Sequence, residues 1–336
     1  MNEMRNVLII TGLFLVIMSH ACMKKAPSDP HVFVTPTNTP YHKLLAIIGD
    51  DVDGEKVFST ARGLVIDNNG NIFVNNRIFI DHEVVKFNKH GDYIDAWSYT
   101  TTVASWDLFL TVDSSGNVYA NSRCECFIAK LDNNLNLLET WEDCSQWNTE
   151  EESKKTGIHY RDGVGLLISD YGNNSIKRFS TSGQYLSGFS LIAGEAMIRG
   201  FDITTDDAGN IYIVDNDNTC IRKYDSNGNF IKKWGRLSYT SWDQDGLQSP
   251  CAIAYQGGKI AVADYNFDYV KIFDTEGNYL SQIRAFSEDG EKPFNKTIVS
   301  PLGVAFDSEG NVYVSAGIYG EGKDRILKFS SEMFYE

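Results

Sequence analysis

A stretch of acidic and amide residues, Asp-Asn-Asp-Asn at 215–218, has the spacing of oxygen ligands with which calcium loops begin. In an EF-hand loop the fifth residue is again Asp or Asn, the sixth is glycine and the twelfth is glutamate. Counted from Asp215, these positions hold Thr219, Cys220 and Ser226. The EF-hand interpretation therefore fails, and the stretch calls for another explanation.

Asp215 also occupies a fixed position in a pattern that recurs six times along the chain. The residues at this position are, in order, Asn76, Ser122, Asp170, Asp215, Asp264 and Ala316. Three consecutive copies carry Asp, and neighbouring carboxylates are suited to bind a cation such as calcium, or a basic ligand. An Asp at the end of a strand equally accepts hydrogen bonds from the backbone amides of its own turn. The sequence does not choose between these two interpretations.

Aromatic residues accompany the Asp residues in the same predicted loops and are candidate ligand contacts, because exposed aromatics are favoured anchors of binding surfaces. Packing between loops would explain them as well. The aromatic candidates are Tyr171, Tyr265, Phe267 and Tyr319, and Tyr269 lies among them.

Other reactive groups are sparse. The chain has only six histidines, and no zinc-protease, nucleophile-elbow, Walker or dinucleotide motif occurs in its required context. The formal net charge of −15 is a poor match to nucleic-acid phosphates. We expect no nucleic-acid partner and no cofactor, with calcium at the Asp residues as the alternative.

The repeated pattern predicts the elements that position these residues. Segment 63–74 recurs at 109–120, 202–213 and 303–314, with weaker copies at 157–168 and 251–262, and each copy is followed by a second apolar element. Turns such as Asp-Asp-Ala-Gly and Asp-Ser-Asn-Gly separate short β-rich runs, so each unit predicts four strands, a to d. Apolar residues on both faces of the middle strands fit sheets that stack against other sheets. We therefore predict an all-β fold, a six-bladed β-propeller of four-stranded antiparallel blades.

The two ends of the repeat region complement each other. The sixth copy lacks its d strand, whereas residues 43–49 match the apolar pattern and terminal glycine of the d strand at 229–235. The N-terminal strand is therefore expected to complete the last blade and close the ring, which removes an exposed sheet edge.

The pattern Gly-Asn-[Ile/Val]-Tyr-[Ile/Val], followed by [Ile/Val]-x-[Lys/Arg]-[Phe/Tyr]-x-x-x-Gly, resembles the NHL repeat over roughly residues 43–330. The third copy departs from it, and Leu135 replaces a turn glycine in the second. The resemblance implies a binding platform for a protein, peptide or glycan and, less often, an enzyme of the gluconolactonase or strictosidine-synthase type, which often uses calcium. The residues at the starts of a strands that would serve such chemistry are Arg62, Asp107, Arg199 and Asp202.

Strand order sorts the connections onto two faces. The a–b and c–d turns are short and uniform and define one face, which we call the turn face. The b–c and d–a connections vary in length and define the loop face, where binding is expected. The loop face also carries the five cysteines after Cys22, for which we predict disulfides of Cys124 or Cys126 with Cys144, and of Cys220 with Cys251.

The N-terminus resembles the export signal of a bacterial lipoprotein. Arg5 precedes an apolar run at 7–18, and Ala21-Cys22 follows, so Cys22 would carry the lipid. The expected organisation is a signal peptide at 1–21, a Pro-rich tether at 22–42 and the propeller at 43–336. The protein is thus expected in the bacterial cell envelope, anchored to a membrane and facing the periplasm or the exterior.

Overall fold

The computed structural model describes residues 42–49, 58, 60–78, 81–100, 108–122, 127–142, 155–191, 200–240, 243–286, 296–320 and 324–332. In these ranges every regular element is a β-strand. No helix within them is long and apolar enough to span a membrane.

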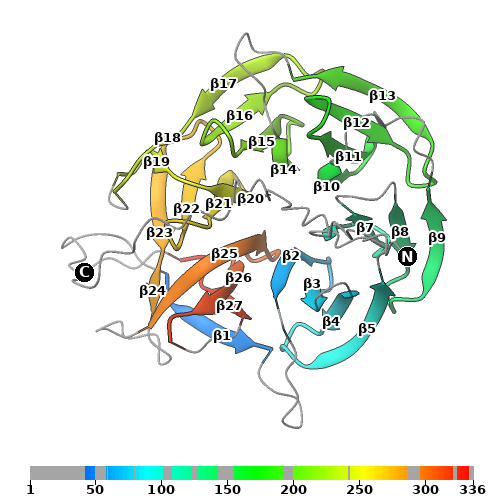
Figure 1. Ribbon diagram of the computed structural model, residues 1–336, viewed down its shortest axis with the longest axis horizontal. Coiled ribbons are helices and arrows are strands. Elements are labelled where there is room, and N and C mark those ends of the chain that lie inside the picture. The colour runs from blue at the N-terminus through cyan, green and yellow to red at the C-terminus, as the bar shows by residue number, and fades with distance from the viewer. Residues whose placement is uncertain are drawn as a thin grey trace, which may run out of the picture.

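Six antiparallel sheets surround a common axis as blades (Figure 1). Blade one comprises β2 (Ala61–Ile66), β3 (Ile72–Ile78), β4 (Asp81–Phe87) and β5 (Tyr93–Thr100), and blade two comprises β6 (Leu108–Val112), β7 (Val118–Ser122), β8 (Ile128–Leu131) and β9 (Leu137–Trp141). Blade three comprises β10 (Lys155–Arg161), β11 (Gly165–Asp170), β12 (Ser175–Phe179) and β13 (Tyr185–Ser190). Blade four comprises β14 (Gly200–Thr205), β15 (Ile211–Asp215), β16 (Cys220–Tyr224) and β17 (Phe230–Trp234), and blade five β20 (Pro250–Gln256), β21 (Lys259–Asp264), β22 (Tyr269–Asp274) and β23 (Tyr279–Ile283).

Blade six joins the two ends of the described chain. It comprises β25 (Lys296–Phe306), β26 (Val312–Ile318), β27 (Asp324–Phe329) and β1 (Leu44–Ile48), with the short β24 (Ala285–Phe286) beside β25. β1 pairs antiparallel with β27, so that Ile48 lies opposite Ile326. The predicted all-β fold of six four-stranded blades, closed by the N-terminal strand, is confirmed.

The apolar core is divided into six clusters, each of which draws its buried residues mainly from two neighbouring blades. Between blades four and five, for example, Val214 and Ile221 pack with Ile253 and Val262, all nearly or fully buried. Each middle strand therefore contributes apolar side chains to both of its faces, which explains the apolar residues on both parities of its sequence. The inner strands of successive blades also lie side by side around the axis (Figure 1).

Turns of sequence Asp-x-x-Gly-Asn are held by their own side chains. At the a–b turn of blade four, Asp206 accepts hydrogen bonds from the backbone and side-chain amides of Asn210, both at 2.8 Å. The hydroxyl of Tyr212 donates to the same carboxylate at 2.8 Å. Burial, and then this hydrogen bond, raises the pKa of the Tyr212 phenol, so the hydroxyl keeps its proton and remains the donor.

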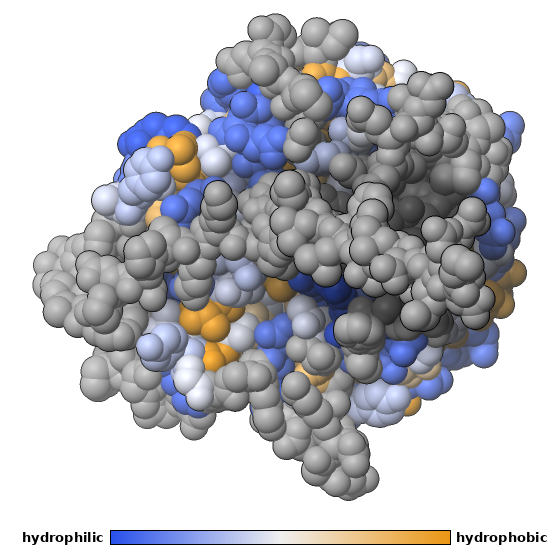
Figure 2. Space-filling model, in the orientation of Figure 1, coloured by the Kyte–Doolittle hydropathy of each residue, from blue (hydrophilic) through white to orange (hydrophobic). Residues whose placement is uncertain are grey.

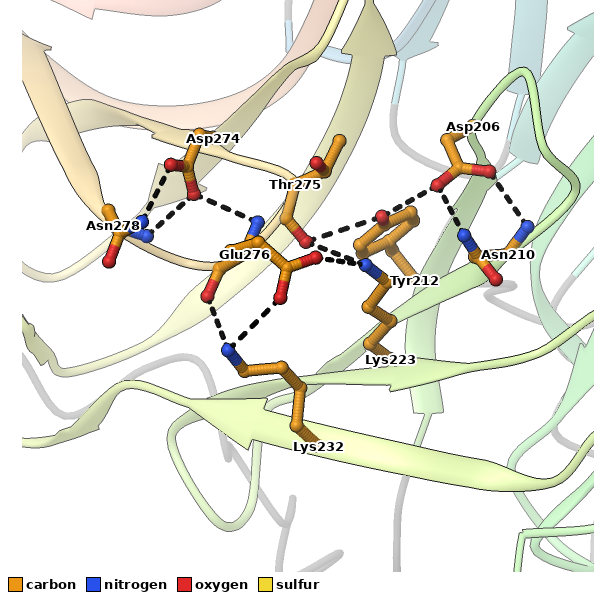
Figure 3. A network of polar contacts seen from close by, with 9 residues as sticks. All are labelled: Asp206, Asn210, Tyr212, Lys223, Lys232, Asp274, Thr275, Glu276 and Asn278. Carbon is orange, nitrogen blue, oxygen red and sulfur yellow. Dashed lines mark hydrogen bonds and ion pairs between the residues drawn. The ribbon is translucent and has the colours of Figure 1, made fainter.

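The c–d turns of blades two to five are also held by the preceding blade, as Figure 3 shows for blade five. Lys223 on β16 of blade four reaches the c–d turn of blade five, where its Nζ lies 3.0 Å from the carbonyl oxygen of Thr275 and 2.8 Å from Glu276. Basic side chains at the same place in the three preceding blades donate to a carbonyl in the next c–d turn, namely Lys86, Lys130 and Arg178. On the turn face, hydrogen bonds of this kind thus connect successive blades from blade one to blade five.

The aromatic residue at the end of a d strand covers the turn glycine of the next blade. Gly277 has φ of 82°, and a Cβ there would come within 2.6 Å of the Trp234 ring. Blade two lacks this arrangement, because Leu135 takes the glycine position with φ of 62° and a buried side chain. The left-handed conformation costs a non-glycine residue about 1–2 kcal/mol, and burial of a leucine side chain contributes about 1.5–3 kcal/mol, which offsets it.

His42 anchors the closing strand from just ahead of β1. Its Nδ1 lies 2.8 Å from the carbonyl oxygen of Ser330 and its Nε2 lies 2.8 Å from the hydroxyl of Ser281, which belongs to blade five. A carbonyl oxygen only accepts, so Nδ1 is the protonated nitrogen and Nε2 accepts from Ser281. Burial lowers the pKa of His42, against the opposing effect of the Ser330 carbonyl. The folded ring therefore holds this imidazole neutral.

Because the pKa of His42 is lower in the folded than in the unfolded chain, its contribution to stability is present above the unfolded value of 6.5 and is lost as the pH falls below it. We expect the melting temperature of the wild type to fall more steeply between pH 7.5 and 5.5 than that of His42→Gln, which retains a hydrogen-bonding side chain but does not titrate there. Thermal unfolding at a series of pH values measures this. His90→Gln, in an exposed turn, is the matched control, and parallel curves for the wild type and His42→Gln would contradict the prediction.

Candidate functional site

The three candidate carboxylates lie at equivalent places on blades three, four and five. Asp170, Asp215 and Asp264 are the last residues of β11, β15 and β21, and each is at most 2% exposed. Each carboxylate accepts a hydrogen bond from the backbone amide three residues further on, at 3.2–3.3 Å. The residue that follows each of those amides has a positive φ, so the three b–c loops share one conformation. This geometry matches the turn-capping interpretation of the Asp residues.

A basic side chain seven residues further on lies near each carboxylate. The Nζ of Lys177 is 2.7 Å from Asp170, and the Nε of Arg222 is 2.7 Å from Asp215 in a pair whose side chains are fully buried. The charge of Lys271 acts on Asp264 in the same sense, although burial still raises the pKa of that carboxyl above its usual value. A cation at this position would have to displace these partners. Within the described ranges, no group of three or more His, Cys, Asp and Glu side chains is placed to hold a metal ion.

Asp264 also fixes the entry into its blade. Its two carboxylate oxygens accept hydrogen bonds from the backbone amides of Gln248, at 2.7 Å, and Ser249, at 3.0 Å. In blade four, the side-chain amide of Asn216 donates to the carbonyl of Pro250 at 2.8 Å. Asp264, a predicted ligand contact, and Asn216 thus hold the connection between blades four and five.

The predicted aromatic contacts separate into packed and exposed residues. Tyr171 is buried, Tyr265 packs against the cluster between blades five and six, and the ring of Phe267 lies 5.3 Å from that of Tyr269. Tyr319, after the last residue of β26, is 65% exposed. Of the four aromatic candidates, Tyr319 is thus the one placed to meet a partner.

A two-stranded element between blades four and five carries further exposed apolar residues that the sequence did not single out. β18 (Arg236–Leu237) pairs in parallel with β19 (Gly246–Leu247), and we call residues 236–240 with 243–247 the arm. In the arm, Leu237 is 49% exposed and Tyr239 is 79% exposed, whereas Ser238 between them is buried. On the face seen in Figure 2, apolar surface occurs as separate spots, one of them over β18.

A buried lysine fixes the arm to blade five. Lys271 on β22 donates to the carbonyl oxygens of Gln244 at 3.1 Å, Gly246 at 2.6 Å and Asp243. The hydroxyl of Tyr269 donates to the same Gly246 carbonyl at 2.9 Å. Burial lowers the pKa of Lys271 to about 8, so its charge depends on these carbonyls and on nearby carboxylates.

Aromatic side chains from the inner strands of blades two and four meet near the axis. The rings of Phe109 and Phe201 are 5.9 Å apart in an edge-to-face arrangement. Beside them, Asp202 accepts hydrogen bonds from the backbone amides of Ile253 at 3.0 Å and Ile203 at 2.9 Å. Burial raises the pKa of the Asp202 carboxyl to about 7. Asp202 therefore connects the inner strands of blades four and five and titrates close to neutral pH.

The other candidates are placed as follows. Arg62 is half-buried on β2, and its carbonyl accepts a hydrogen bond from Ser315 of blade six at 2.9 Å. Asp107, Arg199, the lipidation candidate Cys22, and Cys124, Cys126 and Cys144 lie outside the described residues.

The predicted disulfide between Cys220 and Cys251 is not formed. Both residues are buried thiols. The Sγ of Cys251 lies 3.3 Å from the carbonyl oxygen of Pro301, so this side chain points toward blade six, whereas Cys220 begins β16 in blade four. The two cysteines lie in adjacent blades, but the side chain of Cys251 is directed toward blade six.

No protein-family profile and no curated protein matches the chain. Solved structures do match. A streptogramin B lyase aligns with 12% identity over 86% of this chain and 98% of that chain, at a TM-score of 0.58. A protein of unknown function from Bacteroides thetaiotaomicron VPI-5482 aligns with 14% identity over 88% and 75%, at 0.60, and a chain of a nidogen–laminin complex with 13% identity over 72% and 92%, at 0.52. At these identities the likeness defines the fold alone: the chain is a six-bladed β-propeller, a class that hosts both enzymes and binding proteins.

The buried pair in blade four predicts a large effect of charge removal. Arg222→Met leaves the carboxylate of Asp215 buried without its base, so we expect a loss of about 3–5 kcal/mol in the free energy of unfolding. Adding Asp215→Asn should recover part of the loss. Chemical denaturation measures both.

Lys232→Met is the matched control for this experiment, because Lys232 pairs with Glu276 at 3.5 Å on the surface. Such exposed pairs are worth about 0–1 kcal/mol. If Arg222→Met cost no more than Lys232→Met, the buried pair would have no structural role.

Proposed function

We propose that this protein is an exported, lipid-anchored propeller of the NHL type that binds a protein, peptide or glycan through its loop face. The observation that carries the proposal is the exposure of Tyr239 and Tyr319 on that face. Both residues lie in connections of the loop-face type, d–a and b–c respectively, next to well-packed blades. Large aromatic side chains held on a rigid support are favoured anchors for a partner.

The charges of the candidate site support binding over catalysis. Asp170 and Asp215 each form an ion pair within their own blade, and Asp264 caps the entry to blade five. These carboxylates are therefore committed to the fold. With a formal net charge of −15, the protein favours a partner that carries positive charge.

The position of β1 supports an orientation for the anchored propeller. His42 and Lys43 contact Ser330 directly after β27, so the chain enters the ring at the turn face. A lipid on Cys22, joined through the tether at 22–42, would then be attached on the side opposite the loops. This arrangement presents the loop face to a partner outside the membrane surface.

An enzyme centred on the channel is the second candidate, and Asp202 is the observation that favours it. Its pKa of about 7 suits a general acid or base near neutral pH. Both of its oxygens already accept backbone hydrogen bonds, which favours a structural role. The binding proposal therefore stands first.

The binding function predicts that substitutions on the loop face weaken partner capture. We expect Tyr319→Ser to lower the affinity for a protein or glycan partner by about tenfold, as for an aromatic anchor. Capture from envelope extracts and a glycan array would identify the partner, and titration would measure its affinity. Tyr185→Ser, an exposed tyrosine on the outer strand β13, is the matched control and should leave binding unchanged. Turnover of a lactone that is lost in Asp202→Asn, with no partner captured, would favour the enzyme instead.

The anchor predicts a lipid on Cys22. In the native host, the wild type should incorporate an alkyne fatty-acid probe and sediment with membranes, whereas Cys22→Ser should do neither. Cys251→Ser is the control, since Cys251 is buried in blade five and should not affect labelling. Labelling that persists in Cys22→Ser would refute the lipoprotein assignment.

A further inference from the structure

Among the described residues, β18 pairs only with β19, so the arm leaves one strand edge without a partner strand. The backbone amide of Arg236 donates to Asp245 at 3.2 Å, and that of Ser238 donates to Leu247 at 2.9 Å. In a parallel ladder, alternate residues of a strand turn their amide and carbonyl groups toward the partner strand. The amide and carbonyl of Leu237 therefore point away from β19, along the outer edge of β18. Such an edge is a template for another strand.

The side chains beside this edge suit an extended partner. Leu237 and Tyr239 lie two residues apart and are both exposed, while Ser238 between them is buried. In extended backbone, residues two apart share one face. The arm therefore combines a hydrogen-bonding edge with two apolar side chains at the spacing of alternate residues in a strand.

The arm is fixed before any partner arrives. Lys271 and Tyr269 hold the carbonyl groups of its second half, and Arg236 pairs with Asp243 at 2.7 Å. Leu247 is fully buried in the cluster between blades four and five. An element held in this way loses little conformational entropy on binding, which favours affinity.

We propose that β18 is the docking edge for an extended peptide segment, which adds to the arm as a third strand. The segment carries aliphatic or aromatic side chains at alternate positions, which pack on Leu237 and Tyr239. The net charge of −15 selects a segment with basic residues in between. Main-chain hydrogen bonds give such complexes their affinity, and alternate side chains give specificity. The inference rests on the proposed binding function and names the partner class as a peptide.

The test uses the whole protein and a labelled heptapeptide that alternates lysine and valine, with blocked ends. Fluorescence anisotropy should show saturable binding to the wild type. Leu237→Pro removes the outward amide and keeps the amides of Arg236 and Ser238, so we expect binding to weaken by about tenfold. Tyr239→Ser should weaken it by about fivefold, as the loss of one anchor. Tyr185→Ser, on the outer strand β13, is the control and should leave this binding unchanged.

Two further peptides identify the binding mode. The same peptide with all of its internal amides N-methylated should lose binding, since it then offers no N–H to a strand edge in either direction. A heptapeptide alternating glutamate and valine should bind more weakly. Thermal unfolding of Leu237→Pro shows whether the propeller remains folded, and Tyr239→Ser provides the test if it does not.

Equal binding of the methylated peptide, equal binding by Leu237→Pro, or no binding at about millimolar peptide would each overturn the inference. Binding of a glycan through Tyr239 alone would overturn it as well. The outcome is separable from that of the proposed function. If the native partner depends on Tyr319 and not on β18, the function stands and the docking edge is refuted. If the peptide binds at β18 while extracts yield no partner, the docking edge stands and the proposed function is refuted.

Discussion

The structure depends on contacts in which one blade donates to the c–d turn of the next, as blades one to four do. In Figure 3, Lys223 and Tyr212 of blade four both approach the carbonyl of Thr275, which belongs to the turn of blade five. The c–d turns of blades two to five therefore take a donor from the preceding blade. A chain of such contacts needs a partner at each end, and only a closed ring supplies one. β1 meets this need, since it pairs with β27 and its Ile48 packs against Gly91 in the first c–d turn.

The same requirement determines where recognition can reside. Ring contacts use the polar side chains of the turn face and of the b–c loops in blades three to five, where Asp215 and Arg222 are buried as a pair. Once these groups are committed to the fold, the connections that no blade contact requires are left for binding. The outer half of the arm is such a segment. Its inner half is buried through Leu247, and its outer half presents Tyr239 to solvent.

The sequence predicted the fold because the repeat makes every blade evidence for the others. Six copies of one pattern gave the strand order, and the missing d strand identified residues 43–49 as its replacement. The site was harder to predict. The basic partners of the Asp residues lie seven positions further on in the next strand, a spacing that is visible in the sequence as Asp170 with Lys177, but only once the register of β11 and β12 is known.

Other features depend on side-chain direction or on contacts that differ from blade to blade, so the repeated pattern does not predict them. Cys220 and Cys251 lie in adjacent blades, yet the thiol of Cys251 points to Pro301. The arm is a short parallel pairing of two residues from each strand, and no periodic sequence pattern marks such a pairing. Leu135 departs from the turn chemistry and is retained by its burial in the cluster between blades one and two.

The closing strand also fixes the order of events during folding. β1 is the first described strand to be synthesised, and its partner β27 is the last. The contact of His42 with Ser330 spans 288 positions. The strand must therefore stay available, without pairing elsewhere, until β27 has been made. Proteins dominated by such distant contacts fold slowly. The loss of a few residues at the C-terminal end of β27 would consequently leave β1 without the strand it pairs with.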